Sequence, residues 1–79
     1  MKIPRNLSGQ DLVNLLCRAW DYRIVHQEGS HIVLETASPS PHRLAVPAHK
    51  SLRVGTLSAI LRAVARHKGI QRQDLLKSL

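Results

Sequence analysis

The sequence predicts an α+β fold, in which helices cover one face of a three-stranded antiparallel sheet. Three observations predict it. Apolar residues recur at helical spacing over about residues 9–19 and 57–68. Between these stretches lie three short segments typical of strands, over 22–27, 31–35 and 42–46. Turn-forming residues separate the segments, so we expect the order αβββα, followed by a short C-terminal helix.

The first helix follows a capping signal. Ser8 precedes it, and Asp11 three residues later completes a capping box. Before the helix, residues 1–7 are expected to be extended, because Pro4 disfavours a helix there. After the helix, Trp20 is expected to close the core. The apolar face of the helix is formed by Leu12, Leu15, Leu16 and Ala19.

The second strand begins with the histidine of greatest interest. Gly29 and Ser30 are turn residues, and they are expected to join the first two strands as a hairpin. Along the second strand, Ile32 and Leu34 share one face, and His31 lies on the opposite one. If helices cover the face with Ile32 and Leu34, His31 lies on the open face or at its edge.

Two loops flank the third strand. The loop over 36–41 is rich in serine and proline, and Pro47 ends the strand. The loop over 48–55 carries Lys50 and Arg53, just before the second long helix. Backbone amides at that helix N-terminus can hold a phosphate, but an ordinary helix cap explains the same residues equally well.

The second long helix has expected signals at both ends. Thr56 is expected to cap a helix over about 57–68, and Gly69 is suited to its C-terminal end. A last short helix is expected over 74–79. The whole chain, 1–79, is expected to be a single domain.

The charge indicates an anionic partner. The 79 residues include 12 Lys and Arg against five Asp and Glu, for a formal charge of +7. Such an excess favours a nucleic acid or an acidic protein as partner, although a solvated basic surface gives the same count. Aromatic residues are only 3% of the chain, which argues against folds that bind single-stranded bases on an aromatic sheet.

Several classes of protein and site are not supported by the sequence. No apolar run approaches the ~20 residues that span a bilayer, and residues 1–5 begin no signal peptide. The single cysteine, Cys17, allows no internal disulfide and favours a cytoplasmic setting and a buried thiol. The five histidines and five acids show no metal-ligand spacing, and phosphate-binding glycine motifs are absent, so no metal or cofactor is expected.

Two alternatives follow from the predicted element order. The order αβββα is that of the double-stranded RNA-binding domain, which recognises RNA shape and phosphates and need not be catalytic. Residues 63–70 also look like the turn of a helix-turn-helix, which would use Arg72 and Gln73 on DNA.

His31 permits a simple reaction if the partner is RNA. A histidine can exchange a proton near neutral pH, because its ordinary pKa is ~6.5. RNA supplies its own nucleophile, the 2′-hydroxyl, and nearby cations can stabilise the charge on the phosphate. A histidine that merely bonds its neighbours at a hairpin end explains the same position.

The motifs in their order resemble those of HicA, the YcfA-like toxin of HicAB toxin–antitoxin modules. The resemblance covers residues 7–79, although the loop over 36–42 has proline and serine where many relatives are more charged. The matching stretches are Ser8-Gly9, Gly29-Ser30-His31, Ala45-Val46-Pro47-Ala48-His49, Leu52-Arg53-Val54-Gly55-Thr56-Leu57, Lys68-Gly69-Ile70 and Asp74-Leu75-Leu76.

The resemblance implies a fold like that of the double-stranded RNA-binding domain and an endoribonuclease that cleaves mRNA. It implies that His31 is the catalytic histidine and that an acidic HicB antitoxin is the partner that masks it. From their positions, we expect Ser30, Arg43, Lys50 and Arg53 to contact the RNA.

Overall fold

The computed structural model describes residues 7–77, so most of the expected lead-in over 1–7 lies outside the described residues. The elements follow the expected order, which confirms the α+β class and the αβββα layout. They are α1 (Gly9–Ala19), β1 (Arg23–Glu28), β2 (His31–Thr36), β3 (His42–Pro47), α2 (Val54–Lys68) and α3 (Arg72–Lys77).

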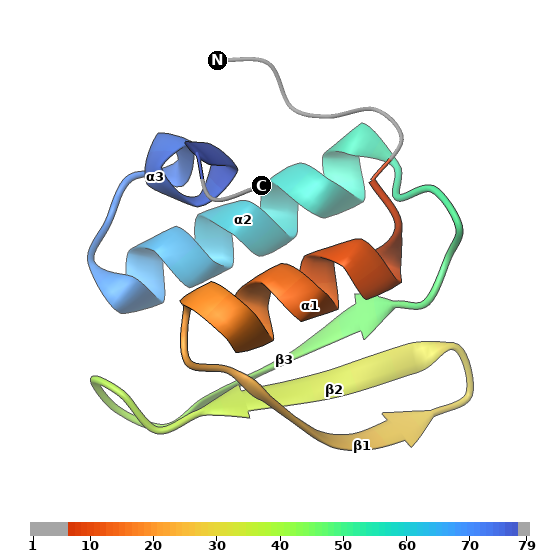
Figure 1. Cartoon of the computed structure of the whole chain (residues 1–79), viewed down its shortest axis with the longest axis horizontal. Coiled ribbons are helices and arrows are strands. Elements are labelled where there is room, and N and C mark those ends of the chain that lie inside the picture. Colours follow the sequence, from red (N-terminus) through yellow and green to blue (C-terminus); the bar gives the residue numbers. More distant parts are fainter. Residues whose placement is uncertain (1–6, 78–79) are drawn as a thin grey trace.

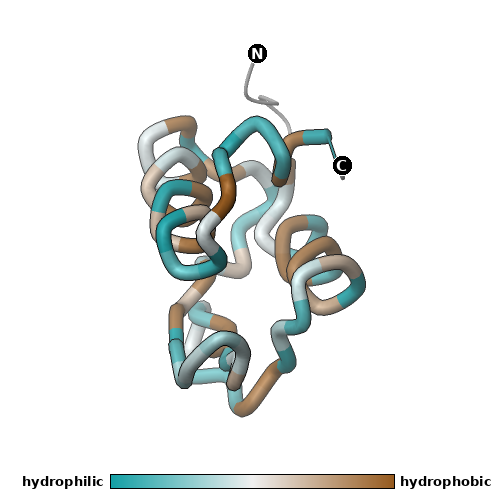
Figure 2. Tube along the Cα trace, turned by 90° about the vertical axis from the view of Figure 1, so that its left-hand side faces the viewer, coloured by the Kyte–Doolittle hydropathy of each residue, from teal (hydrophilic) through white to brown (hydrophobic). Residues whose placement is uncertain are grey.

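The three strands form an antiparallel sheet in the order β1-β2-β3. α1 and α2 lie over one face of this sheet (Figure 1), and the view along the layers shows the helices on one side and the sheet on the other (Figure 2). Side chains from both layers meet in one core, which removes their apolar surface from water. Its most buried members include Leu12, Leu16, Leu34, Val46, Leu57, Leu61, Val64 and Leu75.

The N-terminus of α1 has the capping box that the sequence predicts. The Asp11 backbone N–H donates to Ser8 Oγ at 3.0 Å, and the Ser8 N–H donates to Asp11 Oδ2 at 3.2 Å. These bonds satisfy two backbone donors, and a cap of this kind stabilises a helix by about 1 kcal/mol.

β1 begins one residue later than expected. Asp21 adopts a positive φ of 62°, and the backbone N–H of Tyr22 donates to the Leu16 carbonyl at 3.1 Å. This turn sends the Tyr22 side chain into the core, where it is buried, so the ladder starts at Arg23. The pairing of β1 with β2 also shifts between Ile24 and His26, which marks a bulge.

The start of the second long helix differs from the prediction. Thr56 does not cap it: α2 begins at Val54 with Arg53 as its N-cap, and the Arg53 side chain makes no capping bond. The Leu57 N–H donates to the Arg53 carbonyl at 2.9 Å, and the Leu57 side chain is completely buried. Burial of Leu57 therefore sets the first turn of α2, and tertiary packing outweighs the local capping signal.

The C-terminal part of the structure agrees more closely with what the sequence predicts. Gly69 ends α2 with a φ of 70°, a conformation that glycine adopts easily. α3 begins at Arg72 rather than at residue 74, and residues 78–79 of the expected last helix lie outside the described residues.

The half-buried Trp20 and Cys17 pack against the core, and burial raises the pKa of the Cys17 thiol. No helix in the described part of the chain has the length and apolar character needed to cross a membrane.

Candidate functional site

One end of the molecule brings together the β1–β2 turn, the loop after β3 and the N-termini of α1 and α2 (Figure 1). Backbone hydrogen bonds join these segments. The Ala48 N–H donates to the Ser30 carbonyl at 2.6 Å, and the Gly9 N–H donates to the His49 carbonyl at 2.9 Å. The loop between β3 and α2 is therefore held against both the turn and α1.

His31 lies at this end, on the face of the sheet that points away from the helices. Its neighbour Ile32 is buried in the core, as is Leu34, whereas the His31 side chain is exposed. In the sheet His31 pairs with Pro47 of β3. The alternation along β2 thus gives the placement that the sequence predicts, with an imidazole accessible to a ligand.

Two of the expected cationic residues lie in the adjoining loop. Lys50 follows Ala48 by two residues, at most about 7 Å along the chain. Arg53 stands at the N-terminus of α2, whose first turn contains no acidic residue. Both side chains are exposed. The structure therefore places Lys50, Arg53, Ser30 and His31 at the same end of the molecule.

Arg43 lies at the other end of the sheet. It pairs with Glu35, and the distance from Arg43 Nη2 to Glu35 Oε2 is 2.7 Å. Arg23 approaches the same carboxylate from β1, with Nη2 3.7 Å from Oε1. The hydrogen bond from Arg43 lowers the pKa of Glu35. Glu35 lies four positions after His31 along β2, about 13 Å, so Arg43 is not part of the His31 end.

Glu28 is a neighbour of His31 that the sequence interpretation did not consider. The two residues are direct cross-strand partners in β1 and β2, so both side chains stand on the open face. The exposed Glu28 carboxylate also lies 3.8 Å from His26 Nε2. The two-residue turn Gly29-Ser30 was a signal for this pair, because it places the residues on either side of it opposite each other.

A second cluster of ionisable groups was not predicted at all. The Tyr22 hydroxyl and His42 Nδ1 are 3.0 Å apart, and the rings of His42 and His67 stack with centroids 4.3 Å apart. Burial lowers the pKa of His42, and the nearby His67 and Lys68 lower it further. Burial also raises the pKa of Tyr22 to about 12. No local pattern announces this cluster, because its members come from separate elements.

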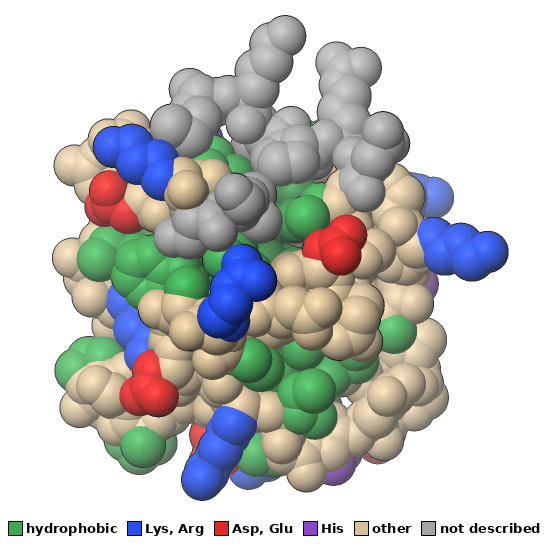
Figure 3. Space-filling model, in the orientation of Figure 1, with side chains coloured by type: hydrophobic (Ala, Val, Ile, Leu, Met, Phe, Trp, Pro, Cys, Tyr) green, Lys and Arg blue, Asp and Glu red, His purple; other side chains and the backbone are tan. Residues whose placement is uncertain are grey.

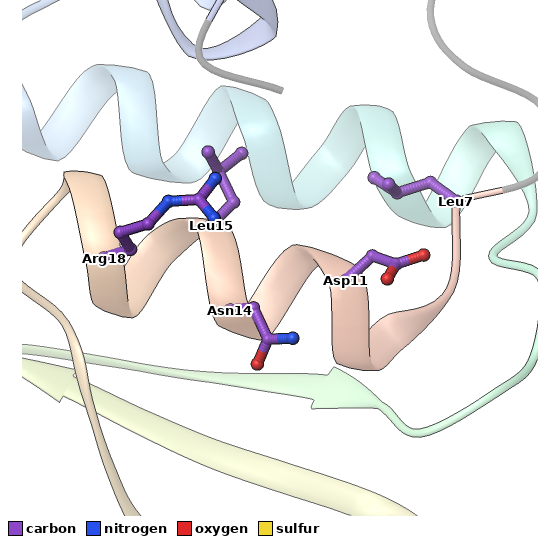
Figure 4. Close-up of a pocket in the computed structure, with 5 residues that line it drawn as sticks. All are labelled: Leu7, Asp11, Asn14, Leu15 and Arg18. Atoms are coloured by element: carbon purple, nitrogen blue, oxygen red, sulfur yellow. The ribbon is translucent and has the colours of Figure 1, made fainter.

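One open hollow of about 250 Å³ runs along α1, with Leu7 and Leu15 pointing toward α2 and Arg18 at its other end (Figure 4). The Asp11 carboxylate in this hollow already serves the capping box. In the view of Figure 3, Lys and Arg side chains are dispersed among apolar, uncharged and acidic ones.

Metal binding finds no support within residues 7–77. No group of three or more His, Cys, Asp or Glu side chains there is arranged to hold a metal ion.

A comparison with models of protein families assigns the chain to a family. The sequence model of the HicA toxins of bacterial toxin–antitoxin systems matches residues 9–65. That range contains α1, the whole sheet, the His31 turn and most of α2. Comparisons with curated proteins and with solved structures gave no match. The chain therefore belongs to the HicA family of toxins from bacterial toxin–antitoxin systems.

Proposed function

We propose that this toxin is an endoribonuclease that cleaves mRNA without a metal ion, with His31 as its general acid and base. The observation that carries the proposal is the meeting of Ser30, His31, Lys50 and Arg53 at one end of a HicA-family fold. These residues come from separate segments, and together they offer one proton carrier and two cations. An mRNA substrate places the reaction in the cytoplasm.

The reaction is an in-line displacement at phosphorus. Neutral His31 accepts the proton of an RNA 2′-hydroxyl, and the 2′-oxygen forms a bond to the adjacent phosphorus. The bond from phosphorus to the 5′-oxygen of the next nucleotide breaks, and that oxygen takes up a proton. The products are a 2′,3′-cyclic phosphate and a 5′-hydroxyl. One histidine serves the two proton transfers in turn, which limits the rate.

Cations at the same end of the molecule as His31 bind and stabilise the phosphate. Lys50 and Arg53 can donate charge-assisted hydrogen bonds to the phosphoryl oxygens, which gain negative charge in the transition state. Ser30 can position the backbone of the RNA through its hydroxyl. Arg43 is held by Glu35, so it would contact only an RNA that extends along the open face of the sheet.

The proposed protein partner is an acidic HicB antitoxin. The toxin carries a formal charge of +7, which favours an acidic surface as its complement. Because the His31 side chain is exposed, a partner that covers the open face at this end would exclude RNA from it. Family membership supports an antitoxin, and the charge indicates its chemistry.

The proposal is tested with the purified toxin, a labelled RNA and excess chelator. We expect cleavage into fragments that end in a 2′,3′-cyclic phosphate. An identical RNA with a single 2′-deoxy nucleotide 5′ of the cut should resist cleavage at that site only, because the nucleophile is missing. Salt-dependent binding of double-stranded RNA with no cleavage would instead support the non-catalytic alternative.

A further inference from the structure

Three arginines surround an open hollow between α2 and α3. Arg62 and Arg66 come from α2 and Arg72 from the start of α3, and with Ala65 they line a volume of about 330 Å³. Arg62 and Arg66 are four residues apart, so their side chains stand on the same side of the helix. Like charges at this spacing repel one another, and a bound anion would offset that repulsion.

The three guanidinium groups are available for an anion. Among residues 7–77, none of them forms an ion pair with a carboxylate. Arg72 Nη1 donates to Ser58 Oγ at 3.0 Å, which fixes that guanidinium on the surface of α2. Guanidinium groups bind phosphate oxygens in pairs of parallel hydrogen bonds. A phosphate group is therefore a suitable ligand for this hollow.

A neighbouring hollow shares Arg66 and adds flat rings. It has a volume of about 460 Å³ and is lined by Arg66, Ala63, His42 and His67. The two imidazoles are held in place, because His42 bonds to the Tyr22 hydroxyl and His67 Nε2 lies 2.9 Å from the Ser40 carbonyl oxygen. Histidine rings and arginine planes are surfaces on which unpaired bases stack.

We propose that Arg62, Arg66 and Arg72 form a second nucleic-acid contact, which binds a backbone phosphate while the adjacent His42–His67 pair receives a base. An anion site beside a ring-lined site matches a polynucleotide strand, in which phosphates and bases alternate. An acidic peptide supplies carboxylates for the arginines but no base for the hollow lined by His42 and His67. The assignment rests on the proposed RNA substrate, but it concerns binding and not cleavage.

The spacing along α2 predicts how long an RNA must be to use both sites. Arg66 lies 13 positions after Arg53, about 20 Å along the helix axis. At the ~3.4 Å rise per nucleotide of a stacked, helical strand, roughly six nucleotides cover this distance. A strand of about twelve nucleotides can engage the His31 end and the arginine hollow together, whereas one of about four can engage only one of them.

The test measures binding of a labelled twelve-nucleotide DNA, which has no 2′-hydroxyl and cannot be cleaved by the proposed reaction. R66Q is compared with R18Q, because both remove an exposed arginine from the last turn of a long helix. We expect R66Q to weaken binding about tenfold, the usual effect of one charge-assisted hydrogen bond. The slope of log binding constant against log salt concentration should become shallower by about 0.7, the value for one phosphate contact on a single strand. R18Q should leave both values nearly unchanged.

Other results of these binding measurements would overturn the site or separate it from the proposed function. Equal loss in R66Q and R18Q would overturn the site, because net charge alone would explain binding. A normal affinity of R66Q for DNA, together with reduced affinity for a polyglutamate peptide, would assign the hollow to an acidic protein and overturn the proposal. Arginine-dependent binding by a toxin that cleaves no RNA would contradict the proposed function and leave this site standing.

Discussion

Gly9 lies directly against the backbone of Pro47, so that a Cβ atom at position 9 would overlap the Pro47 carbonyl oxygen. The Gly9 N–H also donates to the carbonyl of His49. The first residue of α1 therefore fixes the end of β3, and β3 pairs at Pro47 with His31 of β2. A glycine far from His31 in sequence thus helps to set the position of the candidate site.

We predict that G9A destabilises the protein by about 1–3 kcal/mol, the usual cost of forcing an extra methyl group into a packed region. G55A is the matched control, because a Cβ atom there meets open space and alanine is the better helix former. G55A should increase stability by about 0.5–1 kcal/mol. Urea unfolding measures both changes, and a neutral G9A would contradict the close packing of α1 on β3.

Arg53 departs from the residue preference at a helix N-cap, and the proposed binding of RNA explains why an arginine stands there. Serine is preferred at a helix N-cap, whereas the arginine there makes no capping bond and puts a cation at the positive end of the helix dipole. We predict that R53S stabilises the fold by about 1 kcal/mol and weakens RNA binding. The two effects are measured by urea unfolding and by fluorescence anisotropy.

R53K separates charge from capping in the same experiment. Lysine keeps the cation and cannot cap the helix, so RNA affinity should stay close to that of the parent and stability should not rise. If R53S bound RNA as tightly as the parent, Arg53 would not belong to the RNA-binding surface.

The Tyr22–His42–His67 cluster predicts a pH-dependent stability. His42 has a lowered pKa in the folded protein, because burial and its neighbours His67 and Lys68 disfavour the charged imidazole. Near pH 6.5 and below, the unfolded chain therefore binds a proton that folded His42 does not. Stability contributed by neutral His42 is present above pH 6.5 and is lost as the pH falls toward the lower, folded pKa.

Unfolding in urea at pH 7.5, 6.5 and 5.5 measures this loss. Substitution H42Q removes the titrating group, and H26Q removes an exposed histidine on β1 as a control. The fall in stability between pH 7.5 and pH 5.5 should be smaller in H42Q than in the parent and unchanged in H26Q. A parallel fall in the parent and H42Q would show that other groups cause the pH dependence.

Local patterns were sufficient for much of the fold and for the place of His31. The capping box at Ser8 and Asp11 depends on residues three apart, and the face of β2 follows from simple alternation between His31 and Ile32. Such signals need no knowledge of the rest of the chain. They therefore predicted α1, the hairpin and the open position of His31.

Contacts between distant residues could not be predicted in this way. Thr56 was expected to cap the second long helix. Instead α2 begins at Val54, because the Leu57 side chain in its first turn is buried in the core. Arg43 is an expected RNA contact, and the register of β2 and β3 also places it beside Glu35, an ion pair that no local pattern shows. Both outcomes depend on how the helices and strands pack, which the local sequence does not encode.

The central claim is that His31 carries the protons in RNA cleavage, and one measurement tests it most directly. Cleavage of the same RNA in excess chelator is compared for the parent, H31A and H26A, after unfolding curves have shown that all three are folded. We predict that H31A is slower by at least about 100-fold, the usual contribution of a general acid or base, while H26A keeps the parent rate. A folded H31A that cleaves RNA at the parent rate would contradict the account.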